Sequence, residues 1–99
     1  MNTMYEQEYK ELTEAIIVQA GIDYLKALRI LDICRDIKSA RNRAARRTIQ
    51  EIRKFFKSKW YEELSSDTDG KSMLLRLNRW YREMRESGKL NRIRYLERS

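Results

Sequence analysis

Residues 45–64, ARRTIQEIRKFFKSKWYEEL, decide the fold. Apolar side chains recur here at every third or fourth position, at Ala45, Ile49, Ile52, Phe56, Trp60 and Leu64. This spacing places them on one side of an α-helix and leaves the other sides to polar, mostly basic, residues. We therefore predict a helix over residues 43–64 that turns Phe56 and Trp60 into the core of the protein.

The preceding segment predicts a longer helix over residues 5–38. An apolar stripe at helical spacing contains Tyr9, Leu12, Ile16, Ala20, Ala27, Ile30, Leu31, Cys34 and Ile37. Between Ala15 and Cys34 the other faces are apolar as well. Such a helix must be covered on several sides, either at the centre of the domain or by a second copy of the chain. Gly21, in the middle of the pattern, is expected to mark a kink or a close helix crossing.

Two polar residues, Gln19 and Asp23, fall on or beside this stripe. An unpaired carboxylate is costly to bury, so both side chains need partners. We expect a structural hydrogen bond, or an ion pair, to an arginine or to a tryptophan or tyrosine donor. The alternative is a buried acid with a raised pKa.

The segment SSDTDG, residues 65–70, is the clearest break in the chain, and it offers residues that can cap a following helix. Its oxygen-bearing side chains also suit the start of a calcium-binding loop, but the twelfth position is Arg76, which cannot ligate calcium. We therefore exclude a metal site and predict a helix over residues 70–86. Its apolar stripe contains Met73, Leu74, Leu77, Trp80, Tyr81 and Met84. After Gly88 the chain continues as a short basic turn or tail.

These helices form one domain, residues 1–99. The chain contains no proline and three glycines, which leaves few places for tight turns. Its length is enough to bury roughly 60 to 70% of the surface of the unfolded chain without disulfides or metals. The predicted fold is all-α, a compact bundle of three main helices with a short basic C-terminal turn or tail.

The residue types that are missing exclude several classes of function. Histidine is absent and Cys34 is the only cysteine, so disulfide frameworks, Cys/His zinc sites and histidine bases are ruled out. No nucleophile or carboxylate pair has an activating motif, and we expect neither an enzyme nor a cofactor. The N-terminal segment is acidic, and its apolar run AIIVQA is too short to span a bilayer. We expect a cytoplasmic protein of a bacterial host cell with no membrane partner.

Charge is the main signal of a partner. The net charge is +7, and residues 1–40 contain five Lys or Arg against seven Asp or Glu, whereas residues 41–64 contain eight against three. Such a step favours an acidic partner. The predicted nucleic-acid or partner-binding residues are Arg43, Arg46, Arg47, Arg53, Lys54, Lys57, Tyr61, Arg76, Arg79 and Arg82. Arginine and lysine would contact phosphates while Tyr61 stacks on a base; the alternative is an ordinary solvated helix exterior.

A more specific form of this hypothesis is a helix-turn-helix, in which the last helix enters a DNA groove. The residues presented to the groove would be Lys71, Ser72, Arg76, Asn78 and Arg79. The turn between the two helices is longer than this motif prefers.

Two segments together, AIIVQAGIDYLKAL (15–28) and FFKSKWYEELSSDTDGKSMLLRL (55–77), resemble small proteins encoded by prophages and mobile elements of Firmicutes. The most specific part is the run F-F-x-S-x-W-Y-x-x-L, followed by D-G and a leucine pair. These relatives have no assigned activity, so the resemblance implies a phage-like setting and transfers no functional residue.

We therefore expect a small, basic, non-enzymatic phage-type protein that binds a nucleic acid or a nucleoprotein and has a regulatory role. One alternative is an inhibitor that binds a host defence protein, in the manner of an anti-CRISPR protein. The other is a structural protein that forms a homodimer through its apolar first helix.

Overall fold

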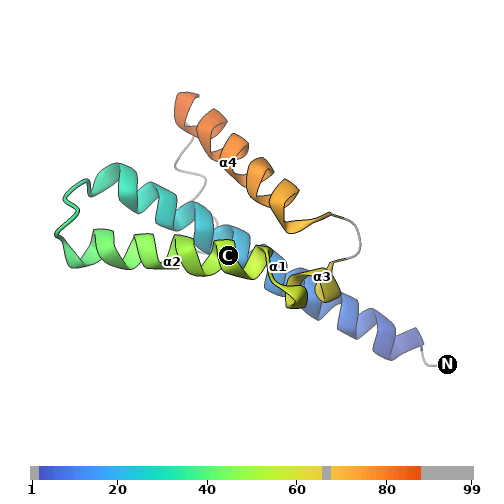
Figure 1. Cartoon of the computed structure of the whole chain (residues 1–99). Helices are drawn as coiled ribbons and strands as arrows, with labels where there is room; N and C mark the ends of the chain where they lie inside the picture. Colours follow the sequence, from blue (N-terminus) through green and yellow to red (C-terminus); the bar gives the residue numbers. More distant parts are fainter. Residues whose placement is uncertain (1–2, 66–67, 88–99) are drawn as a thin grey trace.

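The computed structural model describes residues 3–65 and 68–87, and it contains no strand in these ranges (Figure 1). The four helices are α1 (Thr3–Ile33), α2 (Ala40–Phe56), α3 (Lys59–Leu64) and α4 (Gly70–Glu86). The predicted all-α fold is confirmed, and α4 has the predicted bounds. The other two helices differ from the prediction at their ends, and the predicted basic C-terminal turn lies outside the described residues.

The first difference is the connection between α1 and α2. The predicted helix to residue 38 is too long, because α1 ends at Ile33 and a short loop precedes α2. Ser39 caps α2, and its Oγ accepts a hydrogen bond of 3.0 Å from the backbone N–H of Asn42. The Asn42 side chain donates to the backbone carbonyl of Cys34 at 2.7 Å. These bonds satisfy backbone groups that the two helix ends leave unpaired, and they stabilise the loop.

The second difference is a break inside the predicted helix 43–64. Ser58 Oγ accepts a hydrogen bond from the backbone N–H of Tyr61 at 3.1 Å and donates one to the carbonyl of Phe55 at 2.6 Å. Ser58 therefore ends α2 and caps α3. The break changes the direction of the following side chains, so Tyr61 is fully buried while 54% of Trp60 is exposed. The prediction that Trp60 belongs to the core is wrong.

The core lies where α1, α2, α3 and α4 meet. Its buried side chains are Tyr24, Ala27, Ala45, Ile49, Ile52, Phe56, Tyr61 and Leu74. The predicted stripe of α1 is rotated relative to this core, because Leu12 on the stripe is 60% exposed whereas Tyr24 and Leu25, which lie off it, are buried. Ile37, the last residue of the predicted stripe, lies in the loop after α1 and is 66% exposed. Since α1 is apolar on most sides, its packing partners and not its own pattern decide which side is buried.

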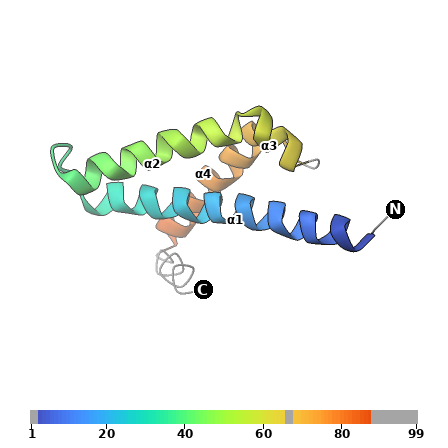
Figure 2. The same ribbon diagram turned by 90° about the horizontal axis from the view of Figure 1, so that it is seen from below.

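The helix α1 packs along α2, and α4 crosses behind this pair and contacts both helices, so α1 is covered on two sides as expected (Figure 2). It continues through Gly21 as one helix, and the buried Gly21 faces Leu77 of α4. A β-carbon placed on Gly21 would lie 3.5 Å from Cδ2 of Leu77 in α4, an ordinary contact distance. Helix α4 therefore crosses α1 beside Gly21, but at a distance that would also admit alanine.

The start of α4 is fixed by two neighbouring residues. Asp69 caps the helix, because its Oδ1 accepts a hydrogen bond of 2.9 Å from the backbone N–H of Ser72. This bond, with a second from the Ser72 hydroxyl, lowers the pKa of Asp69 below its usual value. Next to it, a β-carbon on Gly70 would lie 1.5 Å from the carbonyl oxygen of Phe56, so only glycine fits. The predicted capping role of SSDTDG is confirmed at Asp69.

The molecule is elongated, with extents of 54 × 25 × 23 Å and a radius of gyration of 15.2 Å. A compact chain of this length has a radius of gyration of about 13 Å. The difference arises because α1 is longer than its partners, and its N-terminal part extends past α3 (Figures 1 and 2). None of the helices within the described ranges has the length and apolarity needed to cross a membrane.

Candidate nucleic-acid interface

Six of the predicted binding residues share one flank of α2, which we call the basic flank. They are Arg43, Arg46, Arg47, Arg53, Lys54 and Lys57, and all are exposed. At 100° per residue they occupy an arc of about 120° that faces away from the buried stripe. Glu51, the single acidic residue of α2, lies outside this arc. In the described part of the chain, none of the six forms an ion pair.

The basic flank is long enough to follow a nucleic-acid backbone. From Arg43 to the end of α2 the helix rise corresponds to about 20 Å. One strand of duplex DNA carries a phosphate about every 3.4 Å, so this distance matches roughly six phosphates. The flank can therefore contact several phosphates at once.

Arg46 differs from its neighbours because it also holds the loop between α1 and α2. Its Nε donates to Oδ1 of the buried Asn42 at 2.8 Å, and its Nη2 donates to the carbonyl of Ile37 at 2.9 Å. A guanidinium has five N–H donors, so these two bonds leave three for a ligand. The charge of Arg46 is thus fixed in place at the hairpin end of the flank.

Tyr61, the predicted stacking residue, is not part of this surface. Its side chain has no exposed area, and its ring packs at 66° against Phe56 and at 86° against Phe55. Its hydroxyl donates to the carbonyl of Thr68 at 2.9 Å. The prediction that Tyr61 stacks on a base is therefore wrong. A serine followed within one turn by glutamates, as at Ser58, is a helix-start signal that would have revealed the break in α2.

The predicted arginines of α4 are exposed but belong to a mixed surface. Around α4, at 100° per residue, Arg76, Arg79 and Arg82 alternate with the exposed Glu83 and Glu86. Helix α4 also diverges from α2 toward its C-terminal end (Figure 1). These three arginines therefore do not extend the basic flank of α2.

The helix-turn-helix hypothesis does not fit the positions of its residues. Asn78 is half-buried, and its Oδ1 accepts a hydrogen bond of 2.5 Å from the hydroxyl of Tyr24. The Ser72 hydroxyl donates to Asp69 at 2.9 Å within the helix cap. The first residue of α4, Gly70, is buried against Phe56, so this helix end is closed to a DNA groove.

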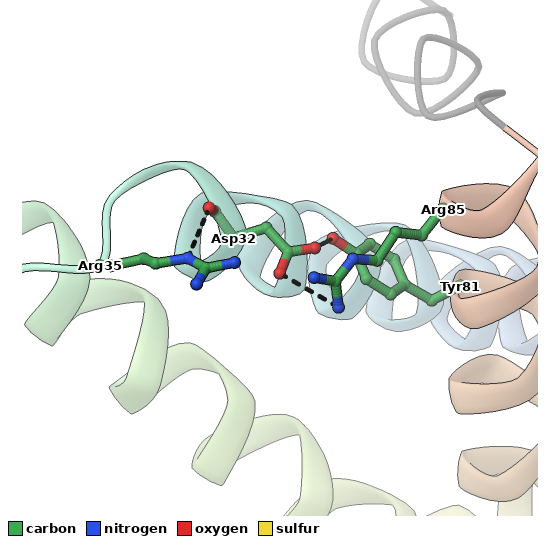
Figure 3. Close-up of polar contacts among 4 residues, drawn as sticks. All are labelled: Asp32, Arg35, Tyr81 and Arg85. Carbon is green, nitrogen blue, oxygen red and sulfur yellow. Dashed lines mark hydrogen bonds and ion pairs between the residues drawn. The ribbon is translucent and has the colours of Figure 1, made fainter.

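A polar cluster that sequence reasoning missed joins α1 to α4 (Figure 3). The hydroxyl of Tyr81 donates a hydrogen bond to Oδ2 of Asp32, and Nη1 of Arg85 lies 3.6 Å from Oδ1 of the same carboxylate. On the other side, Arg35 Nε donates to the backbone carbonyl of Asp32 at 3.5 Å. Burial, and then the Asp32 carboxylate, raise the pKa of Tyr81 above its usual value. The cluster connects residues 49 positions apart, which no local pattern indicates.

Gln19 and Asp23 are each other's partners. Nε2 of Gln19 donates to Oδ1 of Asp23 at 2.9 Å. The expected structural hydrogen bond is confirmed, although its donor is neither an arginine nor an aromatic residue. Asp23 is half-buried, so it is not the enclosed acid of the alternative. Within residues 3–65 and 68–87, no group of three or more cysteine, aspartate or glutamate side chains is placed to hold a metal ion.

No protein-family model, curated protein or solved structure matches this chain. The resemblance to prophage-encoded proteins therefore stays a prediction, and the functional argument rests on the basic flank of α2.

Proposed function

We propose that the protein binds nucleic acid, or the nucleic acid of a nucleoprotein, through the basic flank of α2. The observation that carries this proposal is that six exposed arginine and lysine side chains share one flank and lack ion-pair partners among the described residues. Four of the six are arginines, which contact phosphate oxygens through two parallel N–H donors. The proposed activity is binding without catalysis.

The flank suits a phosphate backbone better than a lipid surface. A helix that lies in a membrane interface needs large apolar side chains next to its cations. On the basic flank the uncharged residue among the cations is Gln50, and Ile49 and Phe56 face the core. The expected contact is therefore polar and independent of base sequence.

Fluorescence anisotropy with a labelled DNA duplex of roughly 20 base pairs, and with the corresponding single strand, tests the proposal. Salt is varied from about 50 to 300 mM, because each neutralised phosphate releases bound counterions. If the five cations other than Arg46 contact phosphates, the logarithm of the duplex affinity should fall with the logarithm of salt concentration with a slope of about −4.5. Failure to bind either oligonucleotide at the lowest salt would contradict the proposal.

A further inference from the structure

An apolar groove runs between α1 and α2 on the face of this helix pair that α4 does not cover. Figure 2 shows α1 and α2 side by side with α4 crossing behind α1. Gly21, which contacts α4, and Asp23, which lines the groove, lie about 160° apart around α1. The groove holds two adjoining hollows of about 330 and 320 Å³, and Asp23 lines both.

The hollow beside Trp60 is lined mostly by apolar side chains. They come from Ile16 and Ala20 of α1, from Ile52 and Phe55 of α2, and from Trp60 of α3. The Trp60 ring meets the Phe55 ring at 75°, with centroids 5.4 Å apart, which fixes its orientation although 54% of the residue is exposed. Tryptophan is one of the residues that most often contribute a large share of the binding energy at protein interfaces. An exposed Trp60 beside an apolar hollow therefore indicates a binding site.

The charges at this hollow are opposite to those of the protein as a whole. Its lining contains two carboxylates, Asp23 and Glu51, and no lysine or arginine, whereas the adjoining hollow is lined by Lys26 and Arg41 as well as by Asp23. Gln19 holds the Asp23 carboxylate at the edge of the groove. The middle of the basic flank lies about 100° around α2 from Glu51, so the flank and the hollow occupy different sides of the helix. The hollow therefore attracts an apolar ligand that carries positive charge.

We propose that the part of this groove beside Trp60 binds an amphipathic, basic helix of another protein. Two antiparallel helices leave a furrow into which a third helix packs at about 8 to 10 Å, with apolar side chains at positions i, i+3 or i+4, and i+7. Those side chains fill the hollow beside Trp60 and cover its ring, and lysine or arginine residues beside them meet Asp23 and Glu51.

A nucleic acid fits the hollow beside Trp60 poorly because its two carboxylates repel phosphate. A second copy of the chain that docked through its exposed Leu12 would bring Glu8 and Glu14 close to these carboxylates. Docking of a second copy through another exposed apolar residue, such as Ile33 or Leu75, is decided by the oligomeric state. The helix-binding groove is thus separate from the basic flank of α2, and each proposal can fail without the other.

Two synthetic peptides of about 14 residues test the proposal, one with a leucine/lysine amphipathic pattern and one with glutamate in place of every lysine. The protein is the full chain with Trp80→Phe, so that fluorescence reports Trp60 alone. We expect the leucine/lysine peptide to shift the Trp60 emission to shorter wavelength and to bind at least about tenfold more tightly than the leucine/glutamate peptide. If the net charge of +7 decided binding, the protein would prefer the leucine/glutamate peptide. A preference for the leucine/lysine peptide therefore reports the local carboxylates.

Two variants locate the contact, with labelled peptides and anisotropy as the readout. Glu51→Lys should abolish or reverse the preference, whereas Glu83→Lys, the same change of charge at an exposed site on α4, should retain it. Trp60→Ala should lower the affinity for the leucine/lysine peptide by at least about tenfold, while circular dichroism confirms that the variant stays folded. Equal affinity for the two peptides, absence of binding, or a Glu51→Lys variant that keeps the preference would overturn the proposal. A dimer in gel filtration, with Trp60 buried in it, would also overturn the proposal.

Discussion

The hydroxyl of Tyr81 on α4 donates a hydrogen bond to the carboxylate of Asp32 on α1, and with the bond from Tyr24 to Asn78 it links the two helices. Tyr81 is 8% exposed and the Asp32 side chain is 25% exposed, so the bond is partly shielded from water. Tyr81→Phe removes the donor and leaves Asp32 with Arg85 alone. Because a hydrogen bond to a charged group contributes about 1.5 to 3 kcal/mol, we expect a loss of that size in the free energy of unfolding, measured with urea.

Arg85→Ala is the matched control for this change. The Arg85 side chain is 53% exposed, and its distance to Asp32 is 3.6 Å. An exposed ion pair contributes at most about 1 kcal/mol. A larger loss for Arg85→Ala than for Tyr81→Phe would contradict our account of the cluster.

The same tyrosine predicts a dependence of stability on alkaline pH. The pKa of Tyr81 in the folded protein is raised above its value of about 10 in an unfolded chain. The contribution of the Tyr81 hydroxyl is therefore complete below about pH 10 and is lost as the pH rises further. Urea unfolding from about pH 8 to 11 should show a steeper loss of stability for the wild-type chain than for Tyr81→Phe. Parallel curves for the two proteins would show that the tyrosine does not titrate in this way.

Replacement of Gly70 and of Gly21 by alanine should change the free energy of unfolding in opposite directions. At Gly70 a β-carbon would lie 1.5 Å from the Phe56 carbonyl oxygen, so the start of α4 must move away. We expect Gly70→Ala to lower the free energy of unfolding by about 2 kcal/mol or more. At Gly21 the nearest atom, in Leu77, would be 3.5 Å away, and alanine favours the helix by about 0.5 to 1 kcal/mol. Thermal unfolding of both variants checks the two signs.

Arg46 and its neighbour Arg47 separate stability from binding. Arg46→Ala removes the bonds to Asn42 and Ile37, and we expect a loss of about 1 to 2 kcal/mol in the free energy of unfolding. Arg47 is exposed and forms no ion pair in the described chain, so Arg47→Ala should change stability by less than about 0.5 kcal/mol. Urea unfolding measures both, and equal effects would refute the structural role of Arg46.

The sequence was sufficient for the fold class and for most of the core. The apolar stripes of α2 and α4 leave little choice as to which side of the helix is buried, because each helix is apolar on one side only. The stripe of α1 was predicted with the wrong phase, since a helix that is apolar all round gives no preferred direction and its partners choose it. The break at Ser58 was missed because the apolar spacing continues across it as far as Trp60.

For the candidate sites as well, one part could be predicted from the sequence and another part could not. The basic flank of α2 follows from local spacing and was predicted residue by residue, except for Tyr61, which the break turns inward. The link between Asp32 and Tyr81 depends on how α4 crosses α1, and the groove beside Trp60 depends on which face α4 leaves open. Relationships of this kind arise from tertiary packing, so no single-sequence pattern contains them.

The most direct test of the proposed function compares two variants that lose the same charge at different places. In one, Arg43, Arg47 and Lys54 on the basic flank are changed to glutamine; in the other, Arg76, Arg79 and Arg82 on α4 are changed. Glutamine has a helix propensity close to those of arginine and lysine, so both variants should fold. Duplex binding is measured by anisotropy as a function of salt. We predict that the salt slope of the α2 variant falls in magnitude by about 2.7, while that of the α4 variant changes by less than about 1. Equal changes in the two variants, or a larger change in the α4 variant, would contradict the assignment of the basic flank of α2 as the nucleic-acid interface.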